Sequence, residues 1–462
     1  IVTLSILALK TLCGSTDEWK SRTIYQALTD RFARSDGSSS PCQNLSNYCG
    51  GNYQGLVNNL DYIQNMGFDA VWISPIVDNT DGGYHGYWAR DWTRLNSNFG
   101  SEQDFKNFVD ECHNRGIWVK VDIVMNHVGP VGTDYSSINP FNSPEHYHDY
   151  CNIDGGDFDG GNQWKVENCR LADLPDLNQS NGWVREQLLS WVENVRDKYS
   201  IDGFRLDTAC EVSKDFWDDL TRRAGTYIVG EVLSGNVPYV ADYQNHLPAL
   251  LNYPMYFTIK SVFKDSHSMY EIKNRLQSDL PQFRDIDALG MFVDNHDNPR
   301  FLNNDTRHHR FKSAICFAMF FRGIAIMYYG SEQLYGGGMD PNNREQMWTN
   351  LDQGTEMYQF VKATVGARKR NRVWQQQQLE KWVDDNFYAF ARGNLLVLTI
   401  NTDYDQSRNI PVSWNEGTRL CNIYNGGDCV NVQGGKVNVT VSGQGPKVYE
   451  VQGYSGMKSE LV

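Results

Sequence analysis

The feature that most constrains the fold of this 462-residue sequence is an alternation of short apolar runs with amphipathic segments. The runs have the length of buried strands, and the segments between them, such as EQDFKNFVDECHNR at 102–115, repeat apolar residues every three or four positions, as helices do. This alternation is typical of a parallel sheet, whose strands are joined by helical crossovers. Eight strand candidates can be counted: IYQAL from Ile24, AVWIS at 70–74, IWVKVDIV at 117–124, GFRLD at 203–207, YIVGE at 227–231, LNYPMY from Leu251, MFVDNHD from Met291 and IAIMYYG from Ile324.

Eight strands are the number that a (β/α)₈ barrel requires, although a doubly wound open sheet shows the same alternation. The positions of the charges distinguish the two, because a closed barrel collects functional groups at the carboxyl ends of many separate strands. Here Asp207, Glu231 and Asp297 end or follow three different strand candidates. We therefore predict an α/β fold with a (β/α)₈ barrel.

Two regions depart from the alternation. Residues 127–177 are rich in Gly, Asp, Asn and Tyr and predict a loop-rich domain inserted after the third strand. Beyond about residue 376 the helical pattern stops, and FYAFAR, LLVLTI and KVNVTV predict a C-terminal antiparallel β-sandwich at 376–462. The barrel is then expected to comprise 18–126 and 178–375, with 1–17 as an extension or signal remnant.

Composition excludes some classes of partner. The net charge of -14 and the lack of a Lys/Arg block argue against nucleic acid. The apolar run IVTLSILAL ends at Lys10, so it is far shorter than the roughly 20 residues that cross a bilayer, and no membrane partner is expected. The 13 Trp, 25 Tyr and 21 Phe residues suit a sugar ligand, although a large α/β core is also rich in aromatic residues.

The cysteines and glycosylation sequons indicate an extracellular protein. Three close pairs in loop-like sequence, Cys42 with Cys49, Cys151 with Cys169, and Cys421 with Cys429, predict disulfides. Acceptor tripeptides for N-glycosylation begin at Asn44, Asn178, Asn304 and Asn438. No role is assigned to Cys13, Cys112, Cys210 or Cys316, and a buried free thiol is expected for Cys112 and Cys316.

Charged residues near the strand ends predict a glycosidase site. In extended GFRLD, Arg205 and Asp207 share one face, and a lone pair of this kind is as readily a buried ion pair as a functional one. Glu231 and Asp297, however, bring two more carboxylates to the same end of the barrel. A retaining glycosidase needs a nucleophile and an acid about 5 to 5.5 Å apart, with their pKa values moved apart by burial and repulsion. His85, His127 and His296 are placed to contact sugar hydroxyls.

Four motifs support this hypothesis: DIVMNH at 122–127, GFRLD, GEV at 230–232 and FVDNHD at 292–297. In order and spacing they resemble the motif regions of glycoside hydrolase family 13, and from about residue 18 onward the chain resembles fungal α-amylases of the Taka-amylase type. The resemblance implies Asp207 as nucleophile, Glu231 as general acid/base, Asp297 as a carboxylate that stabilises the distorted sugar, and Arg205 as the group that orients Asp207. It also implies substrate contacts from His85, Tyr87, Trp88, His127, Gly235, His296, Asp340 and Arg344.

The same resemblance implies a structural Ca²⁺ between the barrel and the inserted domain. Its side-chain ligands would be Asn126 and Asp176, and its backbone ligands the carbonyls of Glu167 and Glu211; alternatively, Asn126 only caps a loop. The chain is shorter than its relatives between Cys169 and LPDL, near Asp176.

Two residues depart from the family pattern. Cys210 and Glu211 stand where the fungal enzymes carry Lys and His, so we expect weaker binding of glucose units on the leaving-group side. Lys120 shares a face with Asp122, and no function is assigned to it.

We expect a secreted, monomeric, calcium-containing α-amylase that cleaves α-1,4-glucans such as starch, glycogen and maltooligosaccharides internally with retention. Alternatives are a maltose-forming, transglycosylating or α-1,6-active member of the family, or an inactive glucan-binding homologue.

Overall fold

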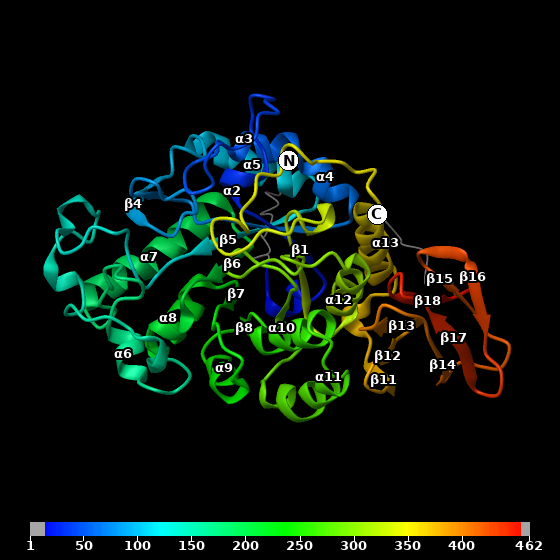
Figure 1. Cartoon of the computed structure of the whole chain (residues 1–462). Coiled ribbons are helices and arrows are strands. Elements are labelled where there is room, and N and C mark those ends of the chain that lie inside the picture. The colour runs from blue at the N-terminus through cyan, green and yellow to red at the C-terminus, as the bar shows by residue number, and fades with distance from the viewer. Residues whose placement is uncertain (1–13, 454–462) are drawn as a thin grey trace, which may run out of the picture.

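The computed structural model describes residues 14–453, in which eight parallel strands form one sheet. The strands are β1 (Thr23–Ala27), β2 (Ala70–Ile73), β5 (Trp118–Ile123), β6 (Gly203–Leu206), β7 (Tyr227–Gly230), β8 (Ala249–Leu250), β9 (Gly290–Met291) and β10 (Ile324–Tyr328). Their order is β8-β7-β6-β5-β2-β1-β10-β9, and a parallel bridge between Leu251 and Gly290 joins the two outer strands. The predicted barrel is therefore confirmed (Figure 1).

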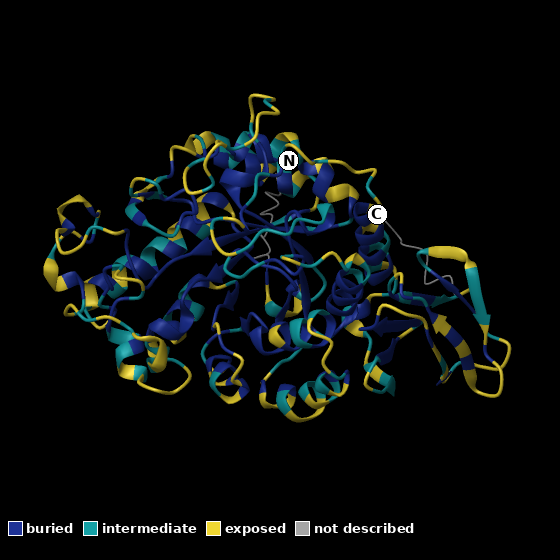
Figure 2. Cartoon of the chain, in the orientation of Figure 1, coloured by how far each residue is buried: buried dark blue, intermediate teal, exposed yellow. Residues whose placement is uncertain are grey.

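Helices follow the strands and cover the outside of the barrel. In α5, for example, Phe105, Phe108 and Cys112 are buried, and Ser101 caps the first turn by accepting a hydrogen bond from the Asp104 backbone N–H. Figure 2 shows the consequence: the central strands are buried, and exposed residues gather on the outer helices and loops. The helices of the barrel region are α1 (Thr16–Trp19), α2 (Thr29–Phe32), α3 (Tyr53–Asn58), α4 (Leu60–Asn65), α5 (Glu102–Asn114), α7 (Gly182–Tyr199), α8 (Lys214–Ala224), α9 (Val237–Tyr243), α10 (Tyr253–Ile259), α11 (Tyr270–Asn274), α12 (His308–Phe320) and α13 (Glu356–Arg370).

One strand prediction was misplaced. The strand expected from Leu251 ends at Leu250, and most of LNYPMY lies in α10. Asn252 ends the strand because its side chain accepts a hydrogen bond from the Met255 backbone N–H, 3.1 Å away, and so caps the helix. Pro254 at the start of the helix fits the same boundary, since proline is tolerated in a first turn.

The barrel interior holds a buried lysine. Lys120 and Asp122 lie on the same face of β5, as the alternation predicted, and both side chains are buried. The Lys120 Nζ lies 4.5 Å from the ring centroids of Trp19 and Tyr227 and has no hydrogen-bond acceptor among residues 14–453. Burial lowers the pKa of Lys120 well below its ordinary value, because the charged ammonium loses its hydration.

The region between β5 and α7 contains little regular structure. It holds short 3₁₀ turns at Tyr135–Ser137, Pro144–His146 and Gly155–Asp157, together with helix α6 (Gln163–Asn168). The hairpin of β3 (Val77–Asn79) and β4 (Ala89–Leu95) pairs with it through a bridge between Asp91 and Asn139. This region extends from one side of the barrel, beside α7 and α8 in Figure 1.

The C-terminal part is antiparallel, as predicted. A six-stranded sheet has the order β11-β12-β13-β18-β15-β16, and β14 pairs with β17. Apolar residues from both sheets, including Leu398, Ile410 and Val439, form one buried cluster between them. The strands are β11 (Gln378–Val383), β12 (Phe387–Arg392), β13 (Leu395–Ile400), β14 (Gln406–Pro411), β15 (Arg419–Asn422), β16 (Asn425–Asn431), β17 (Lys436–Val441) and β18 (Lys447–Val451).

The three predicted disulfides are confirmed. Cys112 and Cys316 are buried free thiols, as expected, whereas Cys13 and the N-terminal apolar run lie outside the described residues. Of the four sequon asparagines, Asn44, Asn304 and Asn438 are exposed and Asn178 is partly buried. Within residues 14–453, no helix has the length and apolar character needed to cross a membrane.

Candidate active site

Three loops at the carboxyl ends of barrel strands hold the predicted catalytic carboxylates. Asp207 follows β6 and donates its backbone N–H to Ile123 O (3.0 Å), and Glu231 follows β7 and donates to Leu206 O (2.9 Å). These bonds extend the strand pairing by one residue and fix both side chains. Asp297 follows β9 in a tight turn, where its backbone N–H donates to the Asn295 side chain (3.2 Å).

The buried guanidinium of Arg205 joins the carboxylates. Its Nη1 lies 2.7 Å from Oδ1 of Asp207 and 3.0 Å from Oδ1 of Asp122, and its Nη2 forms an ion pair with Oε2 of Glu231 at 2.6 Å. One positive charge thus offsets part of the repulsion among three negative groups, which burial would otherwise make very unfavourable. Arg205 and Asp207 are thus not an isolated ion pair, because Arg205 also contacts Glu231, a second predicted catalytic group.

Glu231 is held in an environment that favours its protonated form. Burial raises its pKa well above the ordinary value; Arg205 opposes this shift, whereas the charges of Asp297 and Asp207 add to it. Tyr253 donates its hydroxyl hydrogen to Oε1 of Glu231 (3.0 Å) and accepts a hydrogen bond from Asn295 Nδ2 (2.8 Å). A carboxyl that remains protonated near neutral pH can donate a proton to a leaving group.

Asp122 and Tyr253 are site residues that the sequence reasoning did not identify. Asp122 accepts hydrogen bonds from Trp72 Nε1 (3.2 Å) and from the Tyr87 hydroxyl (2.8 Å). Burial raises the pKa of Asp122 to about 7, with Arg205 lowering it and Asp207 raising it. Asp122 could have been found from the sequence, because alternation places it on the interior face of β5. Tyr253 could not, because it lies in LNYPMY, which was predicted to be a strand.

A series of hydrogen-bonded side chains lies next to Asp122. Gln26 Nε2 lies 2.9 Å from His296 Nδ1, and His296 Nε2 lies 2.6 Å from the Tyr87 hydroxyl. Since the amide of Gln26 donates to Nδ1, the proton of neutral His296 belongs on Nε2 and points to Tyr87. Burial lowers the pKa of His296 well below its usual range. The rings of His296 and His85 each stack with Tyr87, at centroid distances of 5.3 and 5.7 Å.

A second polar group lies near Asp297. Arg344 Nη1 is 3.0 Å from Oδ1 of Asp340, and its Nη2 is 3.7 Å from Oδ1 of Asp297. Tyr84 donates its hydroxyl hydrogen to Asp340 (3.0 Å). Oδ2 of Asp297 is buried without a hydrogen-bond partner in the described part of the chain, and a sugar hydroxyl would satisfy this oxygen.

The remaining predicted substrate contacts surround this cleft at different depths. Trp88 is partly exposed and meets His85 edge to face at 4.8 Å, whereas His127 is buried and its Nε2 bonds the backbone oxygen of Tyr87 (3.1 Å). Gly235 lies against Phe257, because a Cβ atom at Gly235 would be 3.4 Å from that ring. Phe257 and Leu233 were not predicted, yet they are 38% and 52% exposed and give the side beyond Glu231 an apolar surface.

Cys210 and Glu211 are buried and contact each other. The Cys210 thiol donates to Oε2 of Glu211 at 3.1 Å. Burial raises the pKa of Glu211 to about 7; the Cys210 thiol lowers it, and the charge of Asp207 raises it. Neither side chain supplies the cationic donor of Lys or His, and the weaker binding of leaving-group sugars stays a prediction.

Three of the predicted metal ligands bring their oxygen atoms close together. The amide oxygen of Asn126 lies 2.9 Å from Oδ1 of Asp176 and 3.0 Å from the backbone oxygen of Glu211. Three oxygens that converge without a hydrogen between them suit a hard cation such as Ca²⁺, whose ligands lie about 2.3–2.6 Å from the ion. Within residues 14–453 no cluster of three His, Cys, Asp or Glu side chains could hold a metal. The candidate set therefore combines one carboxylate oxygen, of Asp176, with an amide oxygen and a peptide oxygen.

His127 explains why the Asn126 oxygen faces the other two. His127 Nε2 donates to the Tyr87 carbonyl, so in the neutral ring Nδ1 accepts from Asn126 Nδ2, 3.2 Å away. Burial lowers the pKa of His127 and favours that neutral ring. The amide oxygen is thereby turned toward Asp176. For Glu167 the described contact is from its side chain to Gln163 Nε2 (2.8 Å), and the role of its backbone carbonyl stays a prediction.

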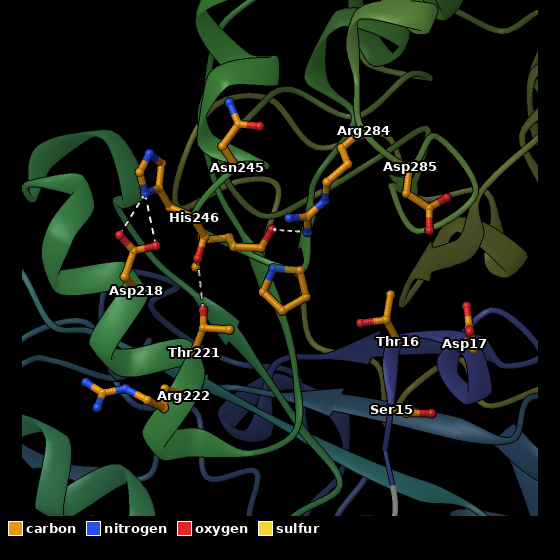
Figure 3. Close-up of a pocket in the computed structure, with 12 residues that line it drawn as sticks. Ser15, Thr16, Asp17, Asp218, Thr221, Arg222, Asn245, His246, Arg284 and Asp285 are labelled. Atoms are coloured by element: carbon orange, nitrogen blue, oxygen red, sulfur yellow. Dashed lines mark hydrogen bonds and ion pairs between the residues drawn. The ribbon is translucent and has the colours of Figure 1, made fainter.

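Another pocket gathers charged residues but lies at the opposite end of the strands. Figure 3 shows Ser15, Asp17 and Asp285, which precede β1 and β9, together with His246 and Asp218. His246 pairs with Asp218 at 3.0 Å, and Lys20 pairs with Asp285 at 2.7 Å. These groups satisfy one another, so the cleft at the carboxyl ends remains the candidate active site.

Comparison with known proteins identifies the family of this chain. The family model described as "Alpha amylase, catalytic domain" matches residues 26–425. "Alpha-amylase 2" of Schwanniomyces occidentalis is 37% identical, over 93% of this chain and 90% of the relative. "Beta/alpha-amylase" of Paenibacillus polymyxa is 37% identical over 94% of this chain, which spans 38% of that longer protein. An α-amylase structure from Malbranchea cinnamomea matches with a TM-score of 0.90 and 35% identity, covering 95% of this chain and 97% of the other.

Proposed function

This chain belongs to the α-amylase family, and from that premise we propose that it is a secreted α-amylase that cleaves internal α-1,4-glucosidic bonds of starch, glycogen and maltooligosaccharides with retention. One observation carries the proposal: a single buried guanidinium, that of Arg205, contacts both Asp207 and Glu231. Two carboxyls on one guanidinium stand close together, as the roughly 5–5.5 Å pair of a retaining glycosidase does.

In the first step, Asp207 attacks the anomeric carbon while Glu231 donates its proton to the leaving oxygen, so that the glycosidic bond breaks as the Asp207–C1 bond forms. Arg205 Nη1, 2.7 Å from Oδ1 of Asp207, orients the nucleophile for this attack. The partial positive charge on the sugar is stabilised by Asp297, whose Oδ2 has no other partner. In the second step, Glu231 takes a proton from water, the resulting hydroxide adds to C1, and Asp207 leaves.

The rings and polar groups around the carboxylates would bind the sugar at the cleavage point. Tyr87 offers a ring for stacking, and His85, Trp88, His127, His296, Asp340 and Arg344 offer hydrogen bonds to hydroxyls. On the opposite side, Gly235 has no side chain next to Phe257 and so leaves room for a sugar.

We propose that Asn126, Asp176 and the Glu211 carbonyl, with the Glu167 carbonyl, hold Ca²⁺, as the resemblance implies. The ion would hold the end of β5 to residue 176 of the loop-rich region and to the turn that follows Asp207. Secretion is supported by the three disulfides and the exposed sequons. We propose that the enzyme acts as a monomer.

A second candidate, a maltose-forming or transferring enzyme, is favoured by one observation, the mutual hydrogen bond of Cys210 and Glu211. A time course on soluble starch and end-blocked maltoheptaose separates the two functions. Early long fragments support internal cleavage, whereas early maltose or transfer products support the second candidate. Glu231→Gln should lower kcat by about 10²–10⁴-fold, and unchanged turnover in that variant would refute the mechanism.

A further inference from the structure

We propose that Lys260 is a positioning residue for catalysis, which fixes the loop that carries Asp297. The inference rests on the proposed function, in which Asp297 stabilises the sugar at the cleavage point. Lys260 begins a short π-helical segment, Lys260–Lys264, that continues α10. Its Nζ donates a hydrogen bond to the backbone oxygen of Pro299, 2.6 Å away and close to Asp297 in the chain.

The loop between β9 and α12 contains no helix or strand, so side chains must hold its backbone. Pro299 has no backbone N–H, and its carbonyl is therefore the polar group through which this residue can be fixed. The carbonyls of His296 and Asn298 accept hydrogen bonds from Asn343 Nδ2, at 2.8 and 2.9 Å. Together, Asn343 and Lys260 hold the backbone on both sides of the catalytic carboxylate.

The contact from Lys260 is a charge-assisted hydrogen bond, which is stronger than a bond between neutral groups. Lys264, one turn further along the same segment, donates a similar bond to the backbone oxygen of Asn303 at 2.9 Å. The two lysines thus attach the π-helical segment to two points of the loop. Lys260 holds the point near Asp297, whereas Lys264 holds the far end.

The charge of Lys260 depends on pH. Burial lowers the pKa of Lys260 to about 8; the negative charges of Asp294 and Asp265 oppose this shift, and the positive charge of Lys264 adds to it. The ring of Tyr256 lies 4.9 Å from Nζ and favours the charged form. Below about pH 8 the ammonium holds the loop, and above that pH the neutral amine holds it less strongly.

Steady-state kinetics on end-blocked maltoheptaose test this role. Lys260→Met replaces the ammonium with an apolar side chain and should lower kcat by about tenfold with KM within about twofold, because Asp297 acts mainly in the transition state. Lys260→Arg keeps a charged donor and should retain most of kcat. Lys264→Met removes the bond to the far end of the loop and serves as the matched control, with kcat expected within about twofold.

A double-mutant cycle shows whether Lys260 acts through Asp297. In an Asp297→Asn background, Lys260→Met should lower kcat by less than about twofold, because the interaction on which it depends is already lost. The pH dependence gives a second readout in the Glu231→Gln protein. Its affinity for maltoheptaose should fall by about threefold between pH 7 and 9 as Lys260 loses its proton, and Lys260→Arg should remove most of this fall.

Amide exchange at Asn298, whose backbone N–H donates to the Asn295 side chain at 3.0 Å, reports on the loop without catalysis. Exchange should be about tenfold faster in Lys260→Met and unchanged in Lys264→Met. An unchanged kcat in Lys260→Met would overturn the inference, and so would an undiminished effect in the Asp297→Asn background. If the unmodified enzyme does not hydrolyse starch, the proposed function fails, while the exchange rates still decide whether Lys260 fixes the loop.

Discussion

The hydrogen bond from Tyr253 to Glu231 leads to a prediction about the alkaline limb of the pH profile. The Tyr253→Phe substitution removes a donor 3.0 Å from Oε1 of Glu231 and leaves the ring in place. A hydrogen bond to a charged group contributes about 1.5–3 kcal/mol, more to the carboxylate than to the protonated acid. Its loss therefore raises the already elevated pKa of Glu231.

At 1.36 kcal/mol per pKa unit, we expect the alkaline limb of kcat/KM to move upward by about one unit. The acid limb of the profile should stay in place. The assay is kcat/KM on end-blocked maltoheptaose across pH, with Tyr256→Phe as the control. Tyr256 lies one turn further along α10, where its ring stacks on Phe292. The reasoning is refuted if the limb stays or moves downward, or if the control moves it equally.

Three further predictions concern other parts of the molecule. Phe257→Ala should raise KM for maltoheptaose by about two- to tenfold and shift the cleavage position, since it removes the exposed ring beyond Glu231; an unchanged product pattern would contradict this role. Chelation should lower the Tm by roughly 5 °C or more because calcium binds the native state alone, and readdition of Ca²⁺ but not Mg²⁺ should restore it; an unchanged Tm after verified metal removal would reject the site. Lys120→Met should raise the Tm at pH 7, because the lowered pKa of Lys120 means that its protonated amine is less stable in the folded chain than in the unfolded chain. The native contribution of Lys120 improves as pH rises toward its unfolded pKa near 10.4, so the gain from Lys120→Met should shrink between neutral and alkaline pH, and a constant gain across that range would contradict the assignment.

The sequence predicted the local pattern well, and the pairing of distant segments less well. Alternation in GFRLD placed Arg205 and Asp207 on one face, and alternation in β5 placed Lys120 inside the barrel. It could not show that Trp19 and Tyr227 would enclose the lysine amine, because those rings come from separate parts of the chain. The strand at LNYPMY was misplaced because apolar content outweighed the capping signal of Asn252 and Pro254.

The departure at Cys210 and Glu211 shows a similar limit. The resemblance to the fungal enzymes identified the missing cationic donors, and on that basis both side chains were related to sugar binding. The structure pairs them with each other in a buried position, and the exposed surface beyond Glu231 comes instead from Leu233 and Phe257.

The barrel has a seam whose position matters for the chemistry. β8 and β9 are the shortest strands of the sheet, with two residues each, and the bridge from Leu251 to Gly290 joins them. The hydrogen bond from Asn295 to Tyr253 crosses this seam just above the bridge. Local opening of the seam would draw the support of the proton donor away from the loop that carries Asp297. Asn252 donates its backbone N–H to Gly290 O across the seam (2.9 Å), so amide exchange at Asn252 reports how often the two halves of the catalytic apparatus separate.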